Sequence, residues 1–301
     1  MILALVGPTA TGKTALAVDV AKALTARGRP AEIVNGDSML VYRGMDIGTA
    51  KPTMAERGGV PHHLIDVLDV TQTASVAQFQ GWARAAIADC EARGVTPIVV
   101  GGSALYVHAI LDQMEFPRTD PAVRAGWEAE LERLGPAALH EELARRDPAA
   151  AAAILPGNGR RIVRALEAIE LTGSFQARLP SPVYALPGVV QIGLAMERDE
   201  LDARIEARVA AMWEDGFVDE VRRLEAVGLR DGLTASRALG YRQVLAFLDG
   251  EMGEAAAKSA TVQATRRFAR KQMSWFRRDG RIAWHRPDAA SLSEAVSKLA
   301  A

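Results

Sequence analysis

The segment GPTATGKT at residues 7–14 has the spacing of a phosphate-binding loop. Gly7, Gly12, Lys13 and Thr14 match the pattern G-x-x-x-x-G-K-[ST], with an apolar run before it and a helical pattern after it. Glycines let the backbone curl so that its N–H groups and a helix N-terminus point at phosphate oxygens. Lys13 adds charge, and the Thr14 hydroxyl can reach a magnesium ion. The segment therefore predicts a site for a phosphate-bearing substrate.

The rest of the sequence does not favour nucleotide hydrolysis. Hydrolysis of ATP or GTP usually adds an Asp at the end of an apolar strand, where it helps to hold magnesium. The apolar run PIVV instead ends in Gly101, Gly102 and Ser103, and no acid follows it. The remaining candidate is Asp37, just past the run AEIVN. It can act as a base toward a hydroxyl in a kinase, or toward an amine in a different transferase.

Strands and helices alternate around these residues. Apolar runs at 2–6, 31–35 and 96–100 predict strands, and helical patterns occupy 13–28 and 75–94. Such alternation predicts an α/β fold, in which a parallel sheet carries helices on its faces. Ligands in these sheets bind beyond the carboxyl ends of the strands, so the candidate residues are expected to meet there.

A helical insertion is predicted over residues 117–188, between core segments 1–116 and 189–301. Asp120-Pro121 and Asp147-Pro148 each combine an N-cap residue with proline at the first helical position. The stretch RRIVRALEAIELTG predicts a further helix ending at Gly173, and the Pro-bearing residues 174–188 predict a loop. The chain then returns through the strand VVQIGLAM, and a last long helix is expected over about residues 254–278.

Composition predicts a globular protein of the cytoplasm without a membrane segment. The 301 residues are 49% hydrophobic and 24% charged. No apolar run approaches the roughly 20 residues of a membrane-spanning helix, and the N-terminus lacks an export signal. Cys90 is alone, so it forms no intramolecular disulfide. Because His62 and His63 are adjacent and point to opposite faces of an extended segment, we expect no zinc site.

Positive charge is concentrated near the end of the chain, although the net charge is −1. Between Thr261 and Arg286, seven arginines and one lysine accompany a single acid, Asp279, which gives a local balance of +7. Such a segment is either a solvated helix face or a surface for a polyanion.

Seven stretches together resemble the bacterial tRNA dimethylallyltransferases, also called tRNA isopentenyltransferases. In chain order they are GPTATGKT, DSMLVYRGMDIGTAKP, PHHLID, GGSALY, RRIVRALE, RALGYRQ and ATRRFARKQMSWFRR. The first is common to many phosphate-binding enzymes, but the set covers nearly the whole chain and is specific. The resemblance implies a P-loop-type parallel sheet with a helical insertion that contacts the tRNA anticodon stem-loop. It also implies transfer of a dimethylallyl group from dimethylallyl diphosphate, with Mg²⁺, to N6 of the adenosine 3′ of the anticodon.

The resemblance also implies roles for single residues. Asp37 accepts a proton from the amine, Ser103 hydrogen-bonds near the bridging oxygen of the diphosphate, and Arg208 neutralises the departing diphosphate. Arg204 lies one helical turn from Arg208 and is a second candidate for that role. Thr14 is the candidate metal ligand. The diphosphate-binding loop comprises Gly7, Pro8, Thr9, Ala10, Thr11, Gly12, Lys13 and Thr14.

Expected tRNA contacts follow from the same stretches, and the flipped target base is expected to enter the site. They are Asp37, Ser38, Met39, Leu40, Ser103, Arg124, Arg160, Arg161, Ile162, Val163, Arg164, Arg237, Ala238, Leu239, Gly240, Tyr241, Arg242, Arg266 and Arg270. Leu40 and Arg160 stand where many family members have Gln, so contacts through those amides are not carried over. The basic segment near the C-terminus is expected to contact phosphates.

Two other classes of function compete with this interpretation. A small-molecule or nucleotide kinase would share the phosphate loop and the Asp base, but it would need no +7 helix. A non-catalytic RNA-binding protein would keep its function after the loss of Lys13. The seven ordered stretches favour the transferase, and a monomer is the expected state.

Overall fold

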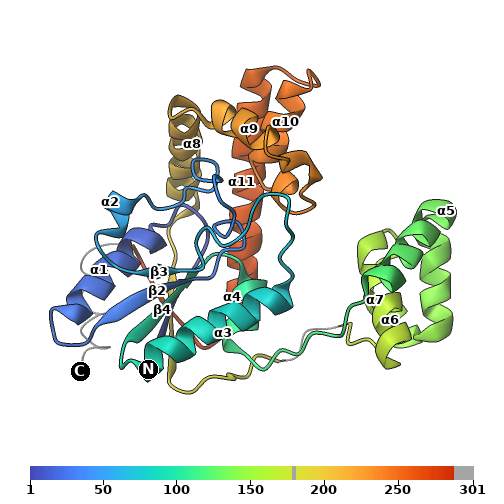
Figure 1. The fold of residues 1–301 in the computed structure, drawn as a ribbon, viewed down its shortest axis with the longest axis horizontal. Helices are drawn as coiled ribbons and strands as arrows, with labels where there is room; N and C mark the ends of the chain where they lie inside the picture. The colour runs from blue at the N-terminus through green and yellow to red at the C-terminus, as the bar shows by residue number, and fades with distance from the viewer. Residues whose placement is uncertain (178–180, 288–301) are drawn as a thin grey trace. The chain divides into compact units, whose positions relative to one another are not determined.

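A six-stranded parallel sheet forms the centre of the larger of two units in the computed structural model, which describes residues 1–177 and 181–287 (Figure 1). The strand order is β3-β2-β4-β1-β5-β6, and every neighbouring pair is parallel. The bounds are β1 Ile2–Val6, β2 Ala31–Asn35, β3 His62–His63, β4 Thr96–Gly101, β5 Val189–Leu194 and β6 Ile282–His285.

Helices cover both faces of this sheet. They are α1 Lys13–Thr25, α2 Met54–Arg57, α3 Val76–Ala92, α4 Ala104–Leu111, α8 Arg198–Glu214, α9 Phe217–Glu225, α10 Tyr241–Leu248 and α11 Glu254–Phe276, with 3₁₀ turns at Leu229–Asp231 and Ala235–Arg237. The long α11 packs against α4, α8 and α10. Figure 1 shows α8 to α11 grouped together in yellow-brown to red.

The central strand β1 explains why the sheet is covered on both sides. Its five residues are all buried, and successive side chains point to opposite faces. Leu3 and Leu5 pack in the apolar cluster that contains α1, whereas Ile2 packs in the cluster that contains α3 and α4. An uninterrupted apolar run of this kind is typical of a parallel strand in the middle of an α/β sheet.

The predicted parallel α/β sheet is confirmed, and the short edge strands are additions to it. The expected strands at 2–6, 31–35, 96–100 and 189 onward are β1, β2, β4 and β5. The sequence did not predict β6 as a strand. It has four residues and pairs with β5 at the edge, which is too short to produce a periodic pattern.

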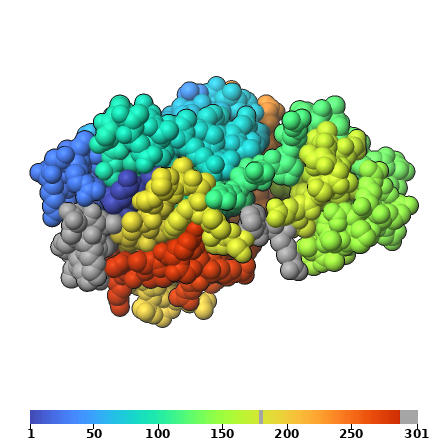
Figure 2. All heavy atoms as spheres, turned by 90° about the horizontal axis from the view of Figure 1, so that it is seen from below, coloured from blue at the N-terminus to red at the C-terminus, as the bar shows by residue number. Residues whose placement is uncertain are grey.

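The smaller unit consists of residues 114–183, and its described part contains the helices α5 Pro121–Arg146, α6 Pro148–Ala153 and α7 Gly159–Thr172. Figure 2 shows its atoms packed as one body, coloured green to yellow-green. Asp120 and Asp147 cap α5 and α6 through their side chains, and a proline follows each, as the sequence predicted. At Gly135, φ is 76°, so α5 is two helices joined at a kink.

The boundaries of this unit differ slightly from the expected 117–188. Residues 184–188 belong with the sheet, because Ala185 N–H donates to Leu111 O at 2.8 Å and Tyr184 forms a bridge with Asp112. Residues 288–301, which the sequence places in the core, lie outside the described residues.

Within the described ranges, no helix combines the length and apolar character that crossing a bilayer requires.

Candidate active site

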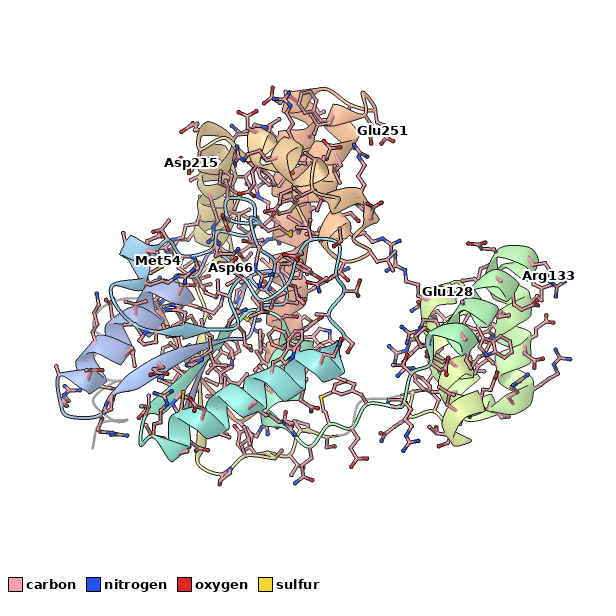
Figure 3. The ribbon with its side chains drawn as sticks, viewed as in Figure 1. Met54, Asp66, Glu128, Arg133, Asp215 and Glu251 are labelled. Carbon is pink, nitrogen blue, oxygen red and sulfur yellow. The ribbon has the colours of Figure 1, made fainter. Side chains whose placement is uncertain are left out.

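A cavity of about 680 Å³ lies at the carboxyl ends of β1, β2 and β4. These neighbouring strands lead into the phosphate loop, Asp37 and Gly101-Gly102, respectively. Parallel neighbours present their carboxyl ends at one edge, so segments far apart in sequence converge there. Asp46, Ile47, residues 49–53, Arg208 on α8 and Gln272 on α11 also line it. Asp215, which lines the cavity from the end of α8, is labelled in Figure 3.

The phosphate loop curls as its sequence predicts. At Gly7, φ is 138°, and a Cβ atom there would lie 2.5 Å from Leu194 O, so only glycine fits. Gly12 has a φ of 88° and caps the N-terminus of α1. Inside the loop the Thr11 hydroxyl donates to Pro8 O at 2.9 Å. This conformation brings the positive end of α1 to the cavity, which favours an anion.

Two cationic side chains, Lys13 and Arg208, meet at the phosphate loop. Lys13 Nζ donates to Pro8 O at 2.6 Å, and Arg208 Nη1 donates to the Thr9 hydroxyl at 3.1 Å. Burial and then the nearby Arg208 charge lower the pKa of Lys13 to about 7, while Asp37 opposes this shift. Burial also lowers the pKa of Arg208, and Asp37 and Glu56 partly offset the effect. Two mutually repelling cations held at one loop are suited to a multiply charged anion.

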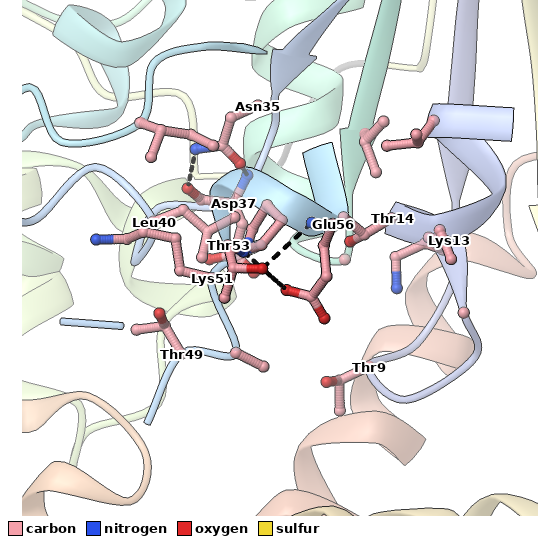
Figure 4. Close-up of a pocket in the computed structure, with 18 of the residues that line it drawn as sticks. Thr9, Lys13, Thr14, Asn35, Asp37, Leu40, Thr49, Lys51, Thr53 and Glu56 are labelled. Atoms are coloured by element: carbon pink, nitrogen blue, oxygen red, sulfur yellow. Dashed lines mark hydrogen bonds between the residues drawn. The ribbon is translucent and has the colours of Figure 1, made fainter. Parts of the chain in front are cut away.

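Asp37 lines the same cavity and is held firmly by its neighbours (Figure 4). Its N–H donates to Asn35 Oδ1 at 2.8 Å, and Asn35 Nδ2 donates back to Asp37 O at 2.8 Å and to Leu64 O at 2.9 Å. One carboxylate oxygen accepts the Met39 N–H at 2.8 Å. These bonds fix the backbone on which the carboxylate is mounted, within the same cavity as the phosphate loop.

The other expected catalytic side chains divide into those at the cavity and those away from it. Arg208 and Thr14 line it. Arg204 does not; it is exposed and lies 3.4 Å from Glu200, so the structure favours Arg208 as the partner of the loop. Ser103 is the N-cap residue of α4, directly after Gly102, but is not among the lining residues.

Several of the expected tRNA contacts have side chains that the structure buries. Tyr241 and Ile162 are fully buried, and Val163 and Ala238 are 4% and 6% exposed. Val163 and Ile162 lie in the core of the smaller unit, and Ala238 and Tyr241 lie in the core that contains α9 and α10. Gly240 is buried as well. The apolar members of RRIVR, together with Ala238 and Tyr241 of RALGYR, therefore pack inside their own units, whereas Leu239 is half-buried.

The four arginines of the smaller unit that were expected to contact tRNA fall into two groups. Arg124 and Arg164 both bind Glu167, whose side chain is fully buried and which also accepts from the Thr119 hydroxyl at 2.7 Å. Arg124 therefore joins α5 to α7, whereas Arg164 lies on α7 itself and donates to the carbonyls of Arg118 and Pro117 ahead of α5. Arg160 and Arg161 are exposed, although Arg161 also bonds Ala177 O.

The expected contacts of the larger unit are partly accessible. Leu40 lines the cavity, and Ser38, Met39 and Leu239 are half-buried. Arg237 and Arg242 are exposed at the two ends of the RALGYR stretch.

The basic helix α11 presents Arg270 to solvent, while Arg266 is engaged within the protein. Arg266 Nη2 lies 2.8 Å from Glu206 Oε2 and 3.2 Å from Asp202 O, both on α8. The polyanion surface expected on this helix therefore relies on Arg270 and its exposed neighbours Arg267 and Lys271.

Glu32, His63 and Cys90 come together on the other side of β2, contrary to the expectation that no such cluster exists. His63 Nε2 lies 2.7 Å from Glu32 Oε2, and Cys90 Sγ lies 3.5 Å from the same oxygen. Arg93 donates to both Glu32 oxygens, at 2.8 and 2.7 Å, and is the main reason the pKa of Glu32 falls to about 2. The carboxylate already has its cation, so we interpret the cluster as a hydrogen-bonded network. Its members are separated by 27 residues or more, and nothing in the sequence signals the contact.

Sequence reasoning missed two features of the cavity. Gln272 on α11 accepts the Thr9 N–H at 2.9 Å, which ties the basic helix to the phosphate loop. The second is the wall formed by residues 46–53. All of the wall except Thr53 lies inside the stretch DSMLVYRGMDIGTAKP, so its position in that stretch was the available signal.

Comparisons with known proteins agree with this geometry. The family model described as IPP transferase matches residues 40–279. A tRNA dimethylallyltransferase of Thermobifida fusca is 63% identical over 299 residues, which cover 99% of this chain and 93% of that protein. One of Kineococcus radiotolerans is 63% identical, with 94% and 90% covered.

Solved structures of tRNA-modifying transferases are also similar to this chain. The full-length tRNA isopentenylpyrophosphate transferase of Bacillus halodurans has a TM-score of 0.73 at 42% identity, and 99% of this chain and 95% of that chain are covered. A eukaryotic dimethylallyltransferase acting on tRNA has a TM-score of 0.77 at 22% identity, which supports the fold. Since the family model and relatives of this identity span most of the chain, the protein belongs to the IPP transferase family.

Proposed function

We propose that the protein transfers a dimethylallyl group from dimethylallyl diphosphate to N6 of the adenosine 3′-adjacent to the anticodon in tRNA, with release of diphosphate. One observation carries the proposal: a single cavity is lined by a phosphate loop, by the two cations Lys13 and Arg208, and by the carboxylate of Asp37. The names of the family's members agree with this chemistry.

The donor's diphosphate would bind the loop of residues 7–14. Lys13 and Arg208 lie where they can neutralise its oxygens, and the helix N-terminus at Gly12 adds backbone donors. Because negative charge on the diphosphate grows as the C–O bond breaks, these fixed cations stabilise the transition state more than the ground state. Arg208 is the partner we assign to the leaving group, since Arg204 is paired on the surface.

The acceptor amine would approach from the side of Asp37. The N6 lone pair forms the new bond to the allylic carbon, the C–O bond breaks, and its electron pair leaves with the diphosphate. Asp37 takes the proton that N6 loses. A well-placed carboxylate contributes about 10²- to 10⁴-fold to such a step. Its rigid mounting between Asn35 and Met39 keeps it in position for this transfer.

The residues present suit magnesium as the cofactor. Mg²⁺ prefers oxygen ligands and usually takes only one or two from the protein, with the rest from substrate phosphates and water. The Thr14 hydroxyl, on the first turn of α1 at the cavity, is the residue that would hold it. Bound there, the ion would reduce the charge on the leaving diphosphate.

Transfer RNA would be bound through exposed basic side chains of both units. Arg160 and Arg161 supply them in the smaller unit, and Arg237, Arg242 and Arg270 in the larger. Contacts of this kind give affinity and salt dependence, while the choice of base is made in the cavity. We propose that the protein works as a monomer in the cytoplasm, where its substrate is found.

The release of diphosphate tests this proposal. The protein is mixed with Mg²⁺, dimethylallyl diphosphate and an unmodified anticodon stem-loop, and diphosphate is measured with and without the RNA. We expect release only when both substrates are present. Release of phosphate from ATP, with none of diphosphate from the prenyl donor, would support the kinase alternative instead.

A further inference from the structure

A buried carboxylate on α9, Glu220, accepts hydrogen bonds from the backbone of the loop that follows Met45. Its Oε2 accepts the N–H groups of Asp46 at 3.1 Å and Ile47 at 2.7 Å, and its Oε1 accepts the Gly48 N–H at 3.2 Å. The Tyr241 hydroxyl donates to Oε1 at 2.6 Å. Glu220 is only 2% exposed, so these four bonds replace the water it has lost.

The four donors fix the geometry of the loop. A buried carboxylate is costly unless its oxygens are hydrogen-bonded, and an ionised one can only accept. Three successive N–H groups can converge on one side chain in very few backbone conformations. Burial, reinforced by the adjacent Glu220, keeps the pKa of Tyr241 well above its usual value, so its hydroxyl remains a donor.

Packing at Gly48 reinforces these hydrogen bonds. A Cβ atom at Gly48 would lie 2.2 Å from the Phe217 ring and 2.6 Å from the Tyr241 ring. These two rings meet edge to face, with centroids 5.0 Å apart, and both are fully buried. The loop backbone is therefore pressed against α9 and α10 while Glu220 holds its N–H groups.

The residues held in this way continue directly into the cavity wall. Asp46, Ile47, Thr49 and Lys51 all line the cavity. Lys51 Nζ bonds Asp46 Oδ1 at 2.7 Å, so the wall is also tied together from its inner side. Figure 4 shows Thr49 and Lys51 on the opposite side of the view from Lys13 and Thr14. If the diphosphate occupies the phosphate loop, the uncharged part of the donor and the adenine are the groups that reach this wall.

We propose that Glu220 is a positioning residue for the alkyl transfer: by holding the backbone of residues 46–48 it sets the cavity wall that aligns the allylic carbon with the acceptor amine. This inference rests on the proposed function. Glu220 touches no substrate and acts only through the loop. It also gives Tyr241, expected from the sequence to contact tRNA, a different role as a donor to this carboxylate.

The test compares three variants in the tRNA prenylation assay. Glu220→Gln keeps the size but turns one acceptor into an NH₂ donor that opposes the loop N–H groups. We expect kcat/KM for dimethylallyl diphosphate to fall about 10- to 100-fold, as misplacement of reacting groups by a fraction of an ångström to 1 Å does. Tyr241→Phe removes one of four donors and should give a smaller loss, about 3- to 10-fold. Asp219→Asn, an exposed neighbour on the same helix, should stay within about 2-fold of the unaltered protein.

A second readout separates positioning from general loss of structure. Inorganic diphosphate, titrated with Mg²⁺, reports on the phosphate loop alone, and its affinity should stay within about 2-fold in both Glu220→Gln and Tyr241→Phe. Unaltered kcat/KM in Glu220→Gln would overturn the inference, as would parallel losses of diphosphate affinity and transfer. If Glu220→Gln does not fold, Tyr241→Phe decides in the same way. No transfer by the unaltered protein would refute the proposed function itself, whereas transfer unaffected by these variants would refute only the role of Glu220.

Discussion

Lys13 should take up a proton when a diphosphate binds. In the free protein, burial and the Arg208 guanidinium hold the pKa of its ammonium at about 7, far below the ordinary value of 10.5. A bound anion acts in the opposite direction, because it stabilises the charged form and so raises the pKa. The sign is therefore fixed: the complex binds more protons than the separate partners at any pH between the two pKa values.

The size of the uptake follows from this lowered pKa of Lys13. With a pKa of about 7, Lys13 is half protonated at about pH 7 and about one-tenth protonated at about pH 8. If the bound anion returns the pKa toward 10.5, uptake is about 0.5 proton at about pH 7 and about 0.9 at about pH 8. At about pH 6 it falls to about 0.1, since the free side chain is already charged.

Calorimetric titration measures this uptake. Inorganic diphosphate is titrated in two buffers of different protonation enthalpy, and the difference in heat gives the number of protons. Lys13→Arg is the matched control, because Arg keeps the positive charge but does not titrate between about pH 6 and about pH 8. Protons taken up or released by the diphosphate itself contribute equally in both proteins and cancel in the comparison. The difference between the two proteins should rise from about pH 6 to about pH 8. A difference near zero at about pH 8 would refute the burial and charge repulsion assigned to Lys13.

Three further outcomes are expected. Asp37→Asn should slow single-turnover transfer by about 10²- to 10⁴-fold while tRNA binding persists, because an amide cannot take the proton; an unchanged rate would remove Asp37 as the base. Arg270→Ala should reduce the slope of log affinity for tRNA against log salt by about 0.7 to 0.9, whereas Arg266→Ala, which loses an arginine already paired with Glu206, should change it less. Identical slopes in all three proteins would exclude α11 as a phosphate surface. Glu167→Gln should destabilise the smaller unit by about 2 kcal/mol, since two part-exposed arginines lose their buried partner. Hydrogen exchange should show that Glu167→Gln lowers the protection of backbone amides within residues 114–183 but not in the sheet. Equal protection of residues 114–183 in the variant and the unaltered protein would contradict the role of Glu167.

The sheet and the smaller unit's helices were predictable because local signals determine them. Continuous apolar runs bounded by glycine predict buried parallel strands, and an Asp-Pro pair caps and starts a helix whatever the tertiary context. The phosphate loop was predictable for the same reason, since Gly7 and Gly12 are required by backbone geometry within eight residues. Convergence of this loop with Asp37 also follows from the parallel order of β1, β4 and β2.

The parts that could not be predicted depend on contacts between distant segments. The hydrogen bonds from the loop after Met45 to Glu220 join residues more than 170 positions apart in the sequence. The network of Glu32, His63 and Cys90 joins two strands and a helix. Burial of Ile162 had a local signal, because it lies on the apolar stripe of α7. The motifs that the resemblance names as tRNA contacts also contain side chains that pack in a core, such as Ile162 and Tyr241.

The mass of the nucleosides in treated tRNA tests the central claim most directly. Unmodified tRNA is incubated with the protein, Mg²⁺ and dimethylallyl diphosphate, then digested and analysed by mass spectrometry, with fragments that locate the altered base. We expect one adenosine, 3′-adjacent to the anticodon, to carry a dimethylallyl group on N6, and no such product with Asp37→Asn on the single-turnover time scale. Recovery of unmodified adenosine at that position, with the protein folded and both substrates present, would contradict it.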